Sequence, residues 1–231
     1  MRHSNQSPAL TVIVPCYNEN EKVIQETFKN FPKEWELIIV DDGSRRPLPC
    51  ARIRHTGNGG YGRAIKCAVR ESKADLVVTM DGDGQHTLMD VRRLHDFIRY
   101  FPHLSMVVGD RRVKETSFKR WLGRKILNWM ATLMANRWIP DLNSGLRIFK
   151  RDVALGYEPI LCNGFSYTAS LTMSMLCDGY SVDWLPIKVH SRHYGRSKVS
   201  LLLDGITTLR YILVIGLALR TRTLRRWFRE W

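Results

Sequence analysis

Two aspartates that follow a short apolar run are the residues of this sequence best suited to chemistry. The run at 76–80 is typical of a buried strand, and Asp81 and Asp83 come next with a glycine after each. In an extended chain, residues two apart point to the same side, so the two carboxylates can converge. Close carboxylates repel each other unless a cation joins them, and their hard oxygen atoms suit Mg²⁺ or Mn²⁺. The pattern predicts a divalent metal site; an acidic turn after a strand is the alternative.

Polar clusters also follow two other predicted strands. Residues 10–14 and 36–40 have strand character, and clusters at 15–19 and 41–44 come directly after them. A glycine-rich turn at 57–62 opens a helix that runs to about 71. Further strands are predicted near 53 and at 75–80, 105–108, 146–149 and 182–187, with helices at 20–30, 87–101, 118–138 and 166–178. This alternation predicts an α/β fold with a mostly parallel sheet flanked by helices, whose ligand lies where the strands end.

The charge of the chain indicates an anionic partner. The 231 residues carry a net charge of +14. Residues 182–231 hold ten Lys or Arg residues against three acidic ones, which is half of that excess. A second basic cluster lies between 111 and 125, within and before the predicted helix at 118–138, which is basic on one side and apolar on the other.

The sequence also bears on compartment and membrane topology. The five cysteines show no CxxC spacing, which is typical of reduced thiols in the cytosol. Residues 1–9 have no apolar segment of the secretory type and are expected to be disordered. The longest apolar run near the C-terminus, 211–219, is about half the length of a spanning helix. We therefore expect a cytoplasmic protein that does not span a membrane.

The C-terminal segment is predicted to be an amphipathic helical appendage, 199–231. An amphipathic helix at 199–219 precedes a tail, 220–231, that mixes arginine with tryptophan and phenylalanine. Cations suit anionic headgroups and aromatic rings suit the headgroup boundary, so peripheral contact with the inner face of a membrane is expected. Packing on the main domain and dimer formation are the alternatives for 199–219.

Six short motifs, in order, resemble those of family 2 glycosyltransferases with the GT-A fold, within them the dolichyl-phosphate mannosyltransferase-like, or polyprenyl-phosphate glycosyltransferase, group. They are VIVPCYNE (12–19), IIVDDGS (38–44), NGGYGRA (58–64), DGDGQH (81–86), SGLRIFKR (144–151) and RHYGRSK (192–198). The resemblance implies a Rossmann-like GT-A domain over 10–198. Between 165 and 172 many relatives place a glutamate that this chain lacks, so the resemblance leaves the identity of the sugar open.

The resemblance implies roles for residues on the donor side. It places a nucleotide-sugar donor against the ends of the first strands and beside a Mg²⁺ or Mn²⁺ ion. The implied donor-binding residues are Pro15, Tyr17, Glu19, Asp42, Asp81 and Asp83, with Asp42 on the base. The implied metal site consists of Asp81, Asp83 and Gln85, in which Asp83 and Gln85 contact the ion. Carboxylates suit the N–H groups of a base and the hydroxyl groups of a ribose.

Arginines are implied to bind the acceptor. Arg111 and Arg124 match family positions that hold the acceptor phosphate, and with Asp83 they are the predicted catalytic residues. A flexible acceptor loop is implied to contribute Arg192, Arg196, Ser197 and Lys198. His190 and His193 lack a third ligand at zinc-like spacing, so a zinc site there is disfavoured.

The predicted function is metal-dependent, inverting transfer of a sugar from a UDP- or GDP-sugar to a polyprenyl (dolichyl or undecaprenyl) phosphate at the cytosolic membrane face. A phosphate acceptor is largely ionised at neutral pH and needs positioning more than a base. One alternative is a transferase with a hydroxyl acceptor on a glycan or glycolipid, for which Asp83 or another carboxylate would act as base. Another is a basic membrane- or nucleic-acid-binding protein without catalysis; acidic strand ends disfavour a nucleic-acid partner. A membrane partner subunit is a further possibility.

Overall fold

The computed structural model describes residues 8–112, 117–188 and 203–229, whose strands form one sheet. The seven strands are arranged in the order β3-β2-β1-β4-β6-β5-β7. All neighbours run parallel except at β6, which is antiparallel to both β4 and β5. The strands are β1 (Leu10–Cys16), β2 (Trp35–Asp41), β3 (Ile53–Arg54), β4 (Leu76–Thr79), β5 (Met106–Asp110), β6 (Arg147–Lys150) and β7 (Val182–Pro186). The predicted α/β fold with a mostly parallel sheet is confirmed.

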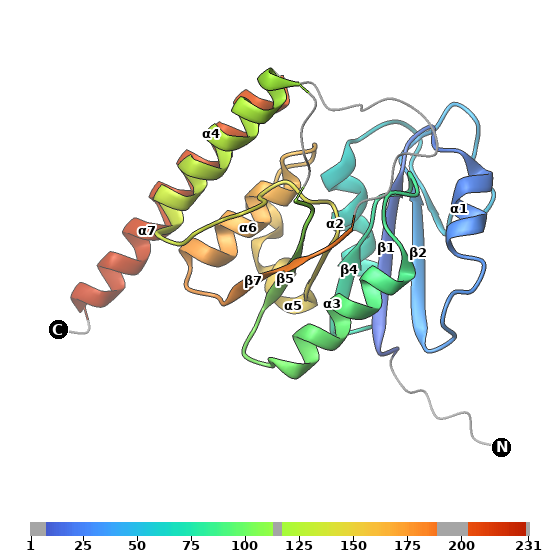
Figure 1. Cartoon of the computed structure of the whole chain (residues 1–231), viewed down its shortest axis with the longest axis horizontal. Helices are drawn as coiled ribbons and strands as arrows, with labels where there is room; N and C mark the ends of the chain where they lie inside the picture. The colour runs from blue at the N-terminus through green and yellow to red at the C-terminus, as the bar shows by residue number, and fades with distance from the viewer. Residues whose placement is uncertain (1–7, 113–116, 189–202, 230–231) are drawn as a thin grey trace.

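Helices cover both faces of the sheet (Figure 1). They are α1 (Glu21–Thr27), α2 (Tyr61–Glu71), α3 (Leu88–Tyr100), α4 (Phe118–Ala135), α5 (Arg151–Tyr157), α6 (Tyr167–Cys177) and α7 (Leu203–Arg229). Because successive strand residues point to opposite faces, Ile13 and Val77 join the core on one side while Val12 and Val78 join the core on the other.

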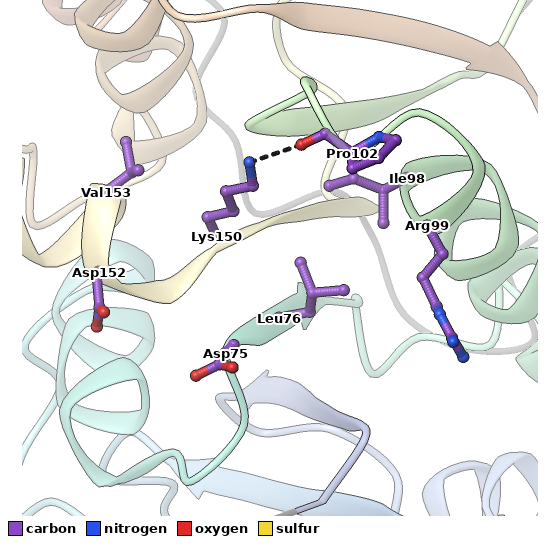
Figure 2. A pocket seen from close by; sticks show the side chains of 8 residues that line it. All are labelled: Asp75, Leu76, Ile98, Arg99, Pro102, Lys150, Asp152 and Val153. Atoms are coloured by element: carbon purple, nitrogen blue, oxygen red, sulfur yellow. Dashed lines mark hydrogen bonds between the residues drawn. The ribbon is translucent and has the colours of Figure 1, made fainter.

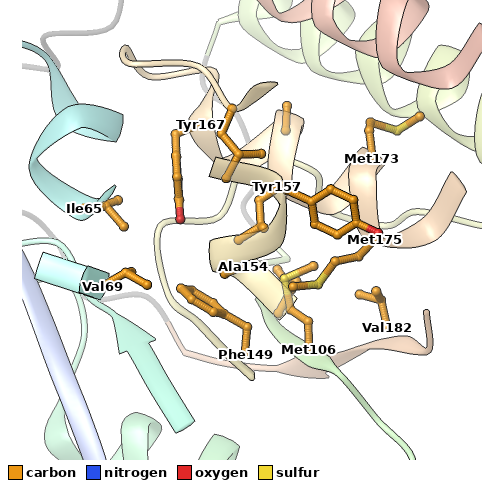
Figure 3. Packing of buried hydrophobic residues seen from close by; sticks show 14 of the residues in the cluster. Ile65, Val69, Met106, Phe149, Ala154, Tyr157, Tyr167, Met173, Met175 and Val182 are labelled. Atoms are coloured by element: carbon orange, nitrogen blue, oxygen red, sulfur yellow. The ribbon is translucent and has the colours of Figure 1, made fainter. Parts of the chain in front are cut away.

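The larger core lies between the sheet and α2, α5 and α6. Figure 3 shows Phe149, Met106 and Val182 of the sheet packed against side chains of these helices, among them Ile65 and Tyr157. Ten consecutive residues of α6, Tyr167–Leu176, are buried, as expected for a helix enclosed by other elements. The second core lies between the opposite face of the sheet and helices α1 and α3.

Several local features differ from the sequence prediction, among them the end of α1 at Thr27, three residues before the predicted end. Helix α5 was not predicted, because its seven residues are too few to establish a helical period. Helix α4 ends at Ala135, three residues before the predicted end, where Asn136 adopts a left-handed conformation with φ 51°. The reversed direction of β6 was not predicted either, since a short apolar run carries no information on strand direction.

The C-terminal segment is one continuous helix in its described part, residues 203–229, and it packs on the domain. Thr208, Ile212, Ile215 and Leu219 are buried, and the three apolar residues belong to the larger core. The Thr208 hydroxyl lies 2.9 Å from that of Ser166 in a hydrogen bond, and α7 runs beside α4 at the margin of the molecule (Figure 1). One face of α7 therefore packs on the main domain, which was one of the alternatives that the sequence left open. Residues 199–202 of the predicted helix lie outside the described residues.

Across the described part of the chain, no helix combines the length and the apolar character needed to cross a membrane.

Substitution of two isoleucines of α7, one buried and one exposed, tests whether this helix is part of the core. Ile212 is 0% exposed and Ile206 is 59% exposed. Ile212→Ala is expected to lower the free energy of unfolding by about 2–5 kcal/mol, because it removes buried methyl groups and leaves a cavity. Ile206→Ala should change it by less than about 0.5 kcal/mol. Urea unfolding measures both, and equal effects would show that α7 is not packed as described.

Candidate functional site

The polar clusters that follow β1, β2 and β4 meet at one edge of the sheet. These three strands are adjacent and parallel, so their carboxyl ends coincide. The Asp42 N–H donates to the Cys16 carbonyl at 2.8 Å, which joins the ends of β2 and β1. A Cβ atom on Gly82 would lie 3.1 Å from Cys16 Sγ and 3.8 Å from Glu19 Cγ, which places the turn after β4 against the β1 end.

The first cluster, after β1, is tied to the loop after β2. The Asn18 N–H donates to Ser44 Oγ at 2.8 Å, and the Arg45 N–H donates to Asn18 Oδ1 at 2.9 Å. Asn18 has φ 50°, a left-handed conformation, and the chain bends here. Pro15 pairs with Val40 in the sheet, and Tyr17 and Glu19 are half-buried on either side of Asn18. Tyr17 and Glu19, which are predicted to hold the base and ribose, thus lie on a loop with a defined conformation, and Pro15 lies near the end of β1.

The two aspartates after β2 organise different loops. Asp41 is fully buried and accepts hydrogen bonds from the Ser44 N–H at 2.8 Å and the Leu48 N–H at 3.1 Å. Burial raises the pKa of Asp41, but these bonds outweigh it and leave the pKa below its usual value.

The Asp42 carboxylate holds the glycine-rich turn. It accepts from the Gly59 N–H at 3.0 and 3.1 Å and from the Gly60 N–H at 2.7 Å, and it lies 2.7 Å from His55 Nδ1. Gly60 has φ 100°, a conformation that favours glycine, immediately before α2 begins. The predicted contact of Asp42 with a nucleotide base stays a prediction.

Asp81 is held by groups from distant parts of the chain. The Tyr61 hydroxyl donates to Asp81 Oδ1 at 3.0 Å, and the Tyr61 ring stacks on Phe165 with centroids 5.7 Å apart. Burial, and then the charge of Asp81, raises the pKa of Tyr61 well above its usual value, so this hydroxyl keeps its proton. Gly145 lies so close on another side that a Cβ atom there would overlap the carboxylate. Asp81 therefore has a defined orientation.

Asp83, Gln85 and His86 continue the cluster after β4. Asp83 Oδ1 accepts from the Gln85 N–H at 3.1 Å. His86 is buried, and within the described structure its Nδ1 atom has no hydrogen-bond partner. Burial lowers the pKa of His86, while the charges of Asp81 and Asp83 oppose this, so the imidazole is neutral at pH 7. Arg111 follows a strand that ends at the same edge, because Thr79 of β4 and Val108 of β5 both pair with Arg147 of β6.

One of the two arginines predicted to hold an acceptor phosphate, Arg111, binds a buried carboxylate, Asp141. Arg111 follows β5 and binds Asp141 in a bidentate pair, with Nε at 2.7 Å and Nη2 at 3.0 Å. Burial raises the pKa of Asp141, but the charge and hydrogen bonds of Arg111, with the charge of Arg124 on α4, hold it below its usual value. Helix α4, which carries Arg124, contacts the same loop, because Asn128 Nδ2 donates to the Pro140 carbonyl at 2.7 Å.

A fully buried arginine, Arg147 of β6, supports this arrangement. Its Nε donates to the Ser144 carbonyl at 3.1 Å, and its Nη1 donates to the Thr168 carbonyl at 2.7 Å and to Thr172 Oγ1 at 2.9 Å. Burial lowers the pKa of Arg147 to about 10, so it remains a cation at neutral pH. Arg147 therefore joins the loop that carries Asp141 and Gly145 to helix α6.

Part of the predicted site lies outside the described residues. This applies to the acceptor-loop residues Arg192, Arg196, Ser197 and Lys198, and to His190 and His193. Among residues 8–112, 117–188 and 203–229, no group of three or more His, Cys, Asp or Glu side chains is arranged to hold a metal ion. Two carboxylates and an amide still fit Mg²⁺ or Mn²⁺, because such ions commonly take one or two carboxylates together with substrate phosphates.

A cavity at the opposite edge of the sheet is unrelated to this site. It has a volume of about 430 Å³ and lies where β4 begins and the antiparallel β6 ends (Figure 2). Asp75 and Asp152 line it together with Arg99 and Lys150, and Lys150 Nζ donates to the Pro102 carbonyl at 2.9 Å. Its charges balance, and it receives none of the polar clusters that follow β1, β2 and β4.

Four residues that shape the site had no predicted role: Tyr61, Asp141, Gly145 and Arg147. Three of them lie in motifs that carried the family resemblance, NGGYGRA and SGLRIFKR. One local signal was present, because Arg147 interrupts an otherwise apolar strand between Leu146 and Ile148, and a buried charge needs dedicated partners. For Asp141 no local pattern was informative.

Comparison with known proteins agrees with this geometry. Residues 11–156 match the sequence profile of Glycosyl transferase family 2. The chain belongs to this family. It is 27% identical over 212 residues to the undecaprenyl-phosphate mannosyltransferase of Micrococcus luteus, covering 81% of this chain and 86% of the relative. It is 25% identical to the polyprenol monophosphomannose synthase of Mycolicibacterium smegmatis, with 82% and 80% covered. Distant relatives of this family 2 glycosyltransferase thus act on polyprenyl phosphates.

Solved structures confirm the GT-A fold. Glucosyl-3-phosphoglycerate synthase from Mycobacterium tuberculosis, in complex with Mn²⁺, UDP-glucose and phosphoglyceric acid, superposes with a TM-score of 0.69 over 93% of this chain and 80% of that one. The identity is 17%, so the likeness concerns the fold.

Gly145→Ala tests the orientation of Asp81 in this family 2 glycosyltransferase. The added methyl group would displace the Asp81 carboxylate, the mobile end of a side chain, while the backbone stays in place. We expect Mn²⁺-dependent affinity for UDP or GDP, measured by calorimetry, to fall at least about tenfold. Gly156→Ala is the control, because a Cβ atom there meets nothing within 4 Å. Unchanged affinity in Gly145→Ala would refute a binding role for this orientation.

Asp141→Asn tests the ion pair with Arg111. We expect a loss of about 2–3 kcal/mol in the free energy of unfolding at pH 7, since Arg111 is only partly exposed and loses its carboxylate. Because the pKa of Asp141 is lowered in the folded state, its stabilisation is complete above about pH 4 and is lost as the pH falls through the folded pKa. Urea unfolding at several pH values should show the two proteins converging in acid. Asp152→Asn, at an exposed position, should show no such pattern.

Proposed function

We propose that this family 2 glycosyltransferase transfers a sugar from a UDP- or GDP-sugar to a polyprenyl phosphate at the cytosolic face of a membrane, with inversion at the anomeric carbon. The observation that carries the proposal is the meeting of two unlike groups of side chains at one sheet edge. Strands β4 and β5, which precede the acidic cluster and Arg111, both pair with β6 at Arg147. Asp81 and Asp83 therefore follow a strand end at the same edge of the sheet as the strand end that Arg111 follows. An acidic cluster suits a metal–diphosphate and paired arginines suit a second phosphate.

The donor half follows from the ends of β1, β2 and β4. Pro15, Tyr17, Glu19 and Asp42 are the candidates for the nucleoside, and Asp81 for the donor beyond it. Asp83 and Gln85, with Asp81 beside them, would hold Mg²⁺ or Mn²⁺. When bound, such an ion neutralises the charge that develops on the departing nucleoside diphosphate. The hydrogen bond from Tyr61 keeps Asp81 oriented before the donor arrives, which lowers the cost of organising the site.

The acceptor half follows from Arg111 and Arg124. A phosphate monoester is already largely ionised at pH 7, so it attacks without a protein base if it is held in line. Asp141 binds Nε and Nη2 of Arg111 and thereby sets the plane of its guanidinium group. The relatives named above, which act on undecaprenyl phosphate and a polyprenol phosphate by their names, support this choice of acceptor. The acceptor loop at 192–198 is proposed to complete the phosphate site.

Asp83→Ala tests the proposed function. Titration of UDP and GDP by calorimetry, with Mn²⁺ and with chelator, is expected to show metal-dependent binding of one nucleotide that the variant loses. Transfer of radiolabelled sugar to a polyprenyl phosphate should then fall about a hundredfold or more, the scale on which removing one contact to developing charge acts. The control is Asp152→Ala, which should behave as wild type, because the Asp152 side chain is 87% exposed and remote from the site.

The same experiments separate the alternatives. Nucleotide binding with transfer only to a glycan or glycolipid hydroxyl group would replace the acceptor and require a carboxylate base such as Asp83. Absence of nucleotide binding under all conditions would refute the transferase and leave a basic binding protein. A membrane partner subunit would be indicated if transfer to polyprenyl phosphate appeared only in a co-purified complex.

A further inference from the structure

Helix α4 turns large apolar side chains toward solvent. Phe118 is 72% exposed and Trp129 is 62% exposed, and Trp138, just beyond the helix, is 71% exposed. We use the name aromatic face for the whole set, which consists of Phe118, Trp121, Leu122, Ile126, Trp129, Leu133 and Trp138. A water-exposed apolar set of this size on one element is typical of an interaction site.

The aromatic face is a regular feature of the helix. Phe118, Leu122 and Ile126 are spaced four residues apart, and Trp129 follows three residues later, so they form one stripe along α4. The opposite side of α4 is occupied, because Ala131 is fully buried in the larger core with Leu127 and Met130 beside it. The stripe therefore cannot turn inward without removing α4 from the core.

The charges that α4 and the segment directly after it carry are all of one sign. Between residues 117 and 140 the sequence contains no Asp or Glu, and its cations are Lys119, Arg120, Arg124, Lys125 and Arg137. Lys119 and Lys125 are exposed within the stretch that carries the stripe. On α7, which packs beside α4, Leu203, Ile206, Val214 and Leu217 are exposed, and Arg210 lies on that same exposed side.

We propose that the aromatic face of α4 is the surface by which this protein binds an anionic lipid bilayer. Tryptophan and phenylalanine rings enter the headgroup boundary while lysines on the same surface attract acidic lipids. A second copy of the chain is a poorer occupant, because a two-fold interface would bring this basic surface against itself and face like charges across it. This inference rests on the proposed function, because membrane binding would bring the enzyme to a polyprenyl acceptor that resides in a bilayer. The test of the inference does not require catalysis.

The test uses the full chain and vesicles of phosphatidylcholine with and without phosphatidylglycerol. Wild type is expected to co-sediment with the anionic vesicles and to dissociate as salt is raised. The double variant Trp129→Ala, Trp138→Ala should bind about tenfold more weakly, since two interfacial rings are removed. Lys119→Glu with Lys125→Glu should weaken binding to the anionic vesicles alone. Tyr100→Ala removes a ring on α3 that is 79% exposed and should change nothing.

Two further measurements separate this inference from the proposed function. UDP and GDP binding with Mn²⁺ should be the same in wild type and in the tryptophan variant. Normal nucleotide binding without any vesicle binding, or vesicle binding that the tryptophan variant retains, would overturn the lipid surface and leave the transferase intact. Light scattering in solution is expected to show a monomer. A dimer that the tryptophan substitutions dissociate would instead assign the aromatic face to a second copy of the chain.

Discussion

The site depends on the hydrogen bonds that one buried cation, Arg147, makes to the surrounding chain. Its guanidinium group lies within the protein and donates to the carbonyls of Leu142, Ser144 and Thr168 and to the hydroxyl of Thr172. A buried charge without such partners is expensive, and the arginine in turn supplies a hydrogen-bond donor to the Leu142 and Ser144 carbonyls of the loop. The cation and the loop therefore require each other, and the backbone between Leu142 and Ser144 has one favoured course.

That course connects the two halves of the site. One end of the loop carries Asp141, which orients Arg111, and the other end carries Gly145, which packs against the Asp81 carboxylate. Thr79, the last residue of β4, also donates to the Gly145 carbonyl at 2.7 Å, directly before the acidic cluster begins. A displacement of the loop would consequently disturb the predicted donor and acceptor residues together. Reversal of β6 makes this possible, because the loop then enters the sheet from the edge where β4 ends.

The sequence allowed prediction of features that depend on neighbouring residues. Polar clusters after apolar strands were recognisable, since a strand and the turn that follows it are local, and their convergence followed from parallel pairing. The bonds that orient these clusters join residues far apart: Tyr61 and Asp81 are 20 residues apart, and Arg111 and Asp141 are 30 apart. A single sequence does not identify such partners. The apolar stripe of α4 was visible as a period, but period alone does not say whether a stripe faces the core or solvent.

Arg124 lies on the same helix as the aromatic face and is a candidate for binding the acceptor phosphate. It lies on α4, the helix that carries the stripe, and its charge acts on the same Asp141 that orients Arg111. The lipid phosphate of a polyprenyl acceptor lies at the headgroup level of a bilayer, the depth at which interfacial tryptophans also settle. Arg124 is on the side of α4 away from the stripe, so a helix held at that depth by its aromatic face would keep Arg124 about one helix diameter from that level. Since the buried side of α4 packs on the catalytic core, membrane contact and acceptor alignment would follow from the position of one rigid element.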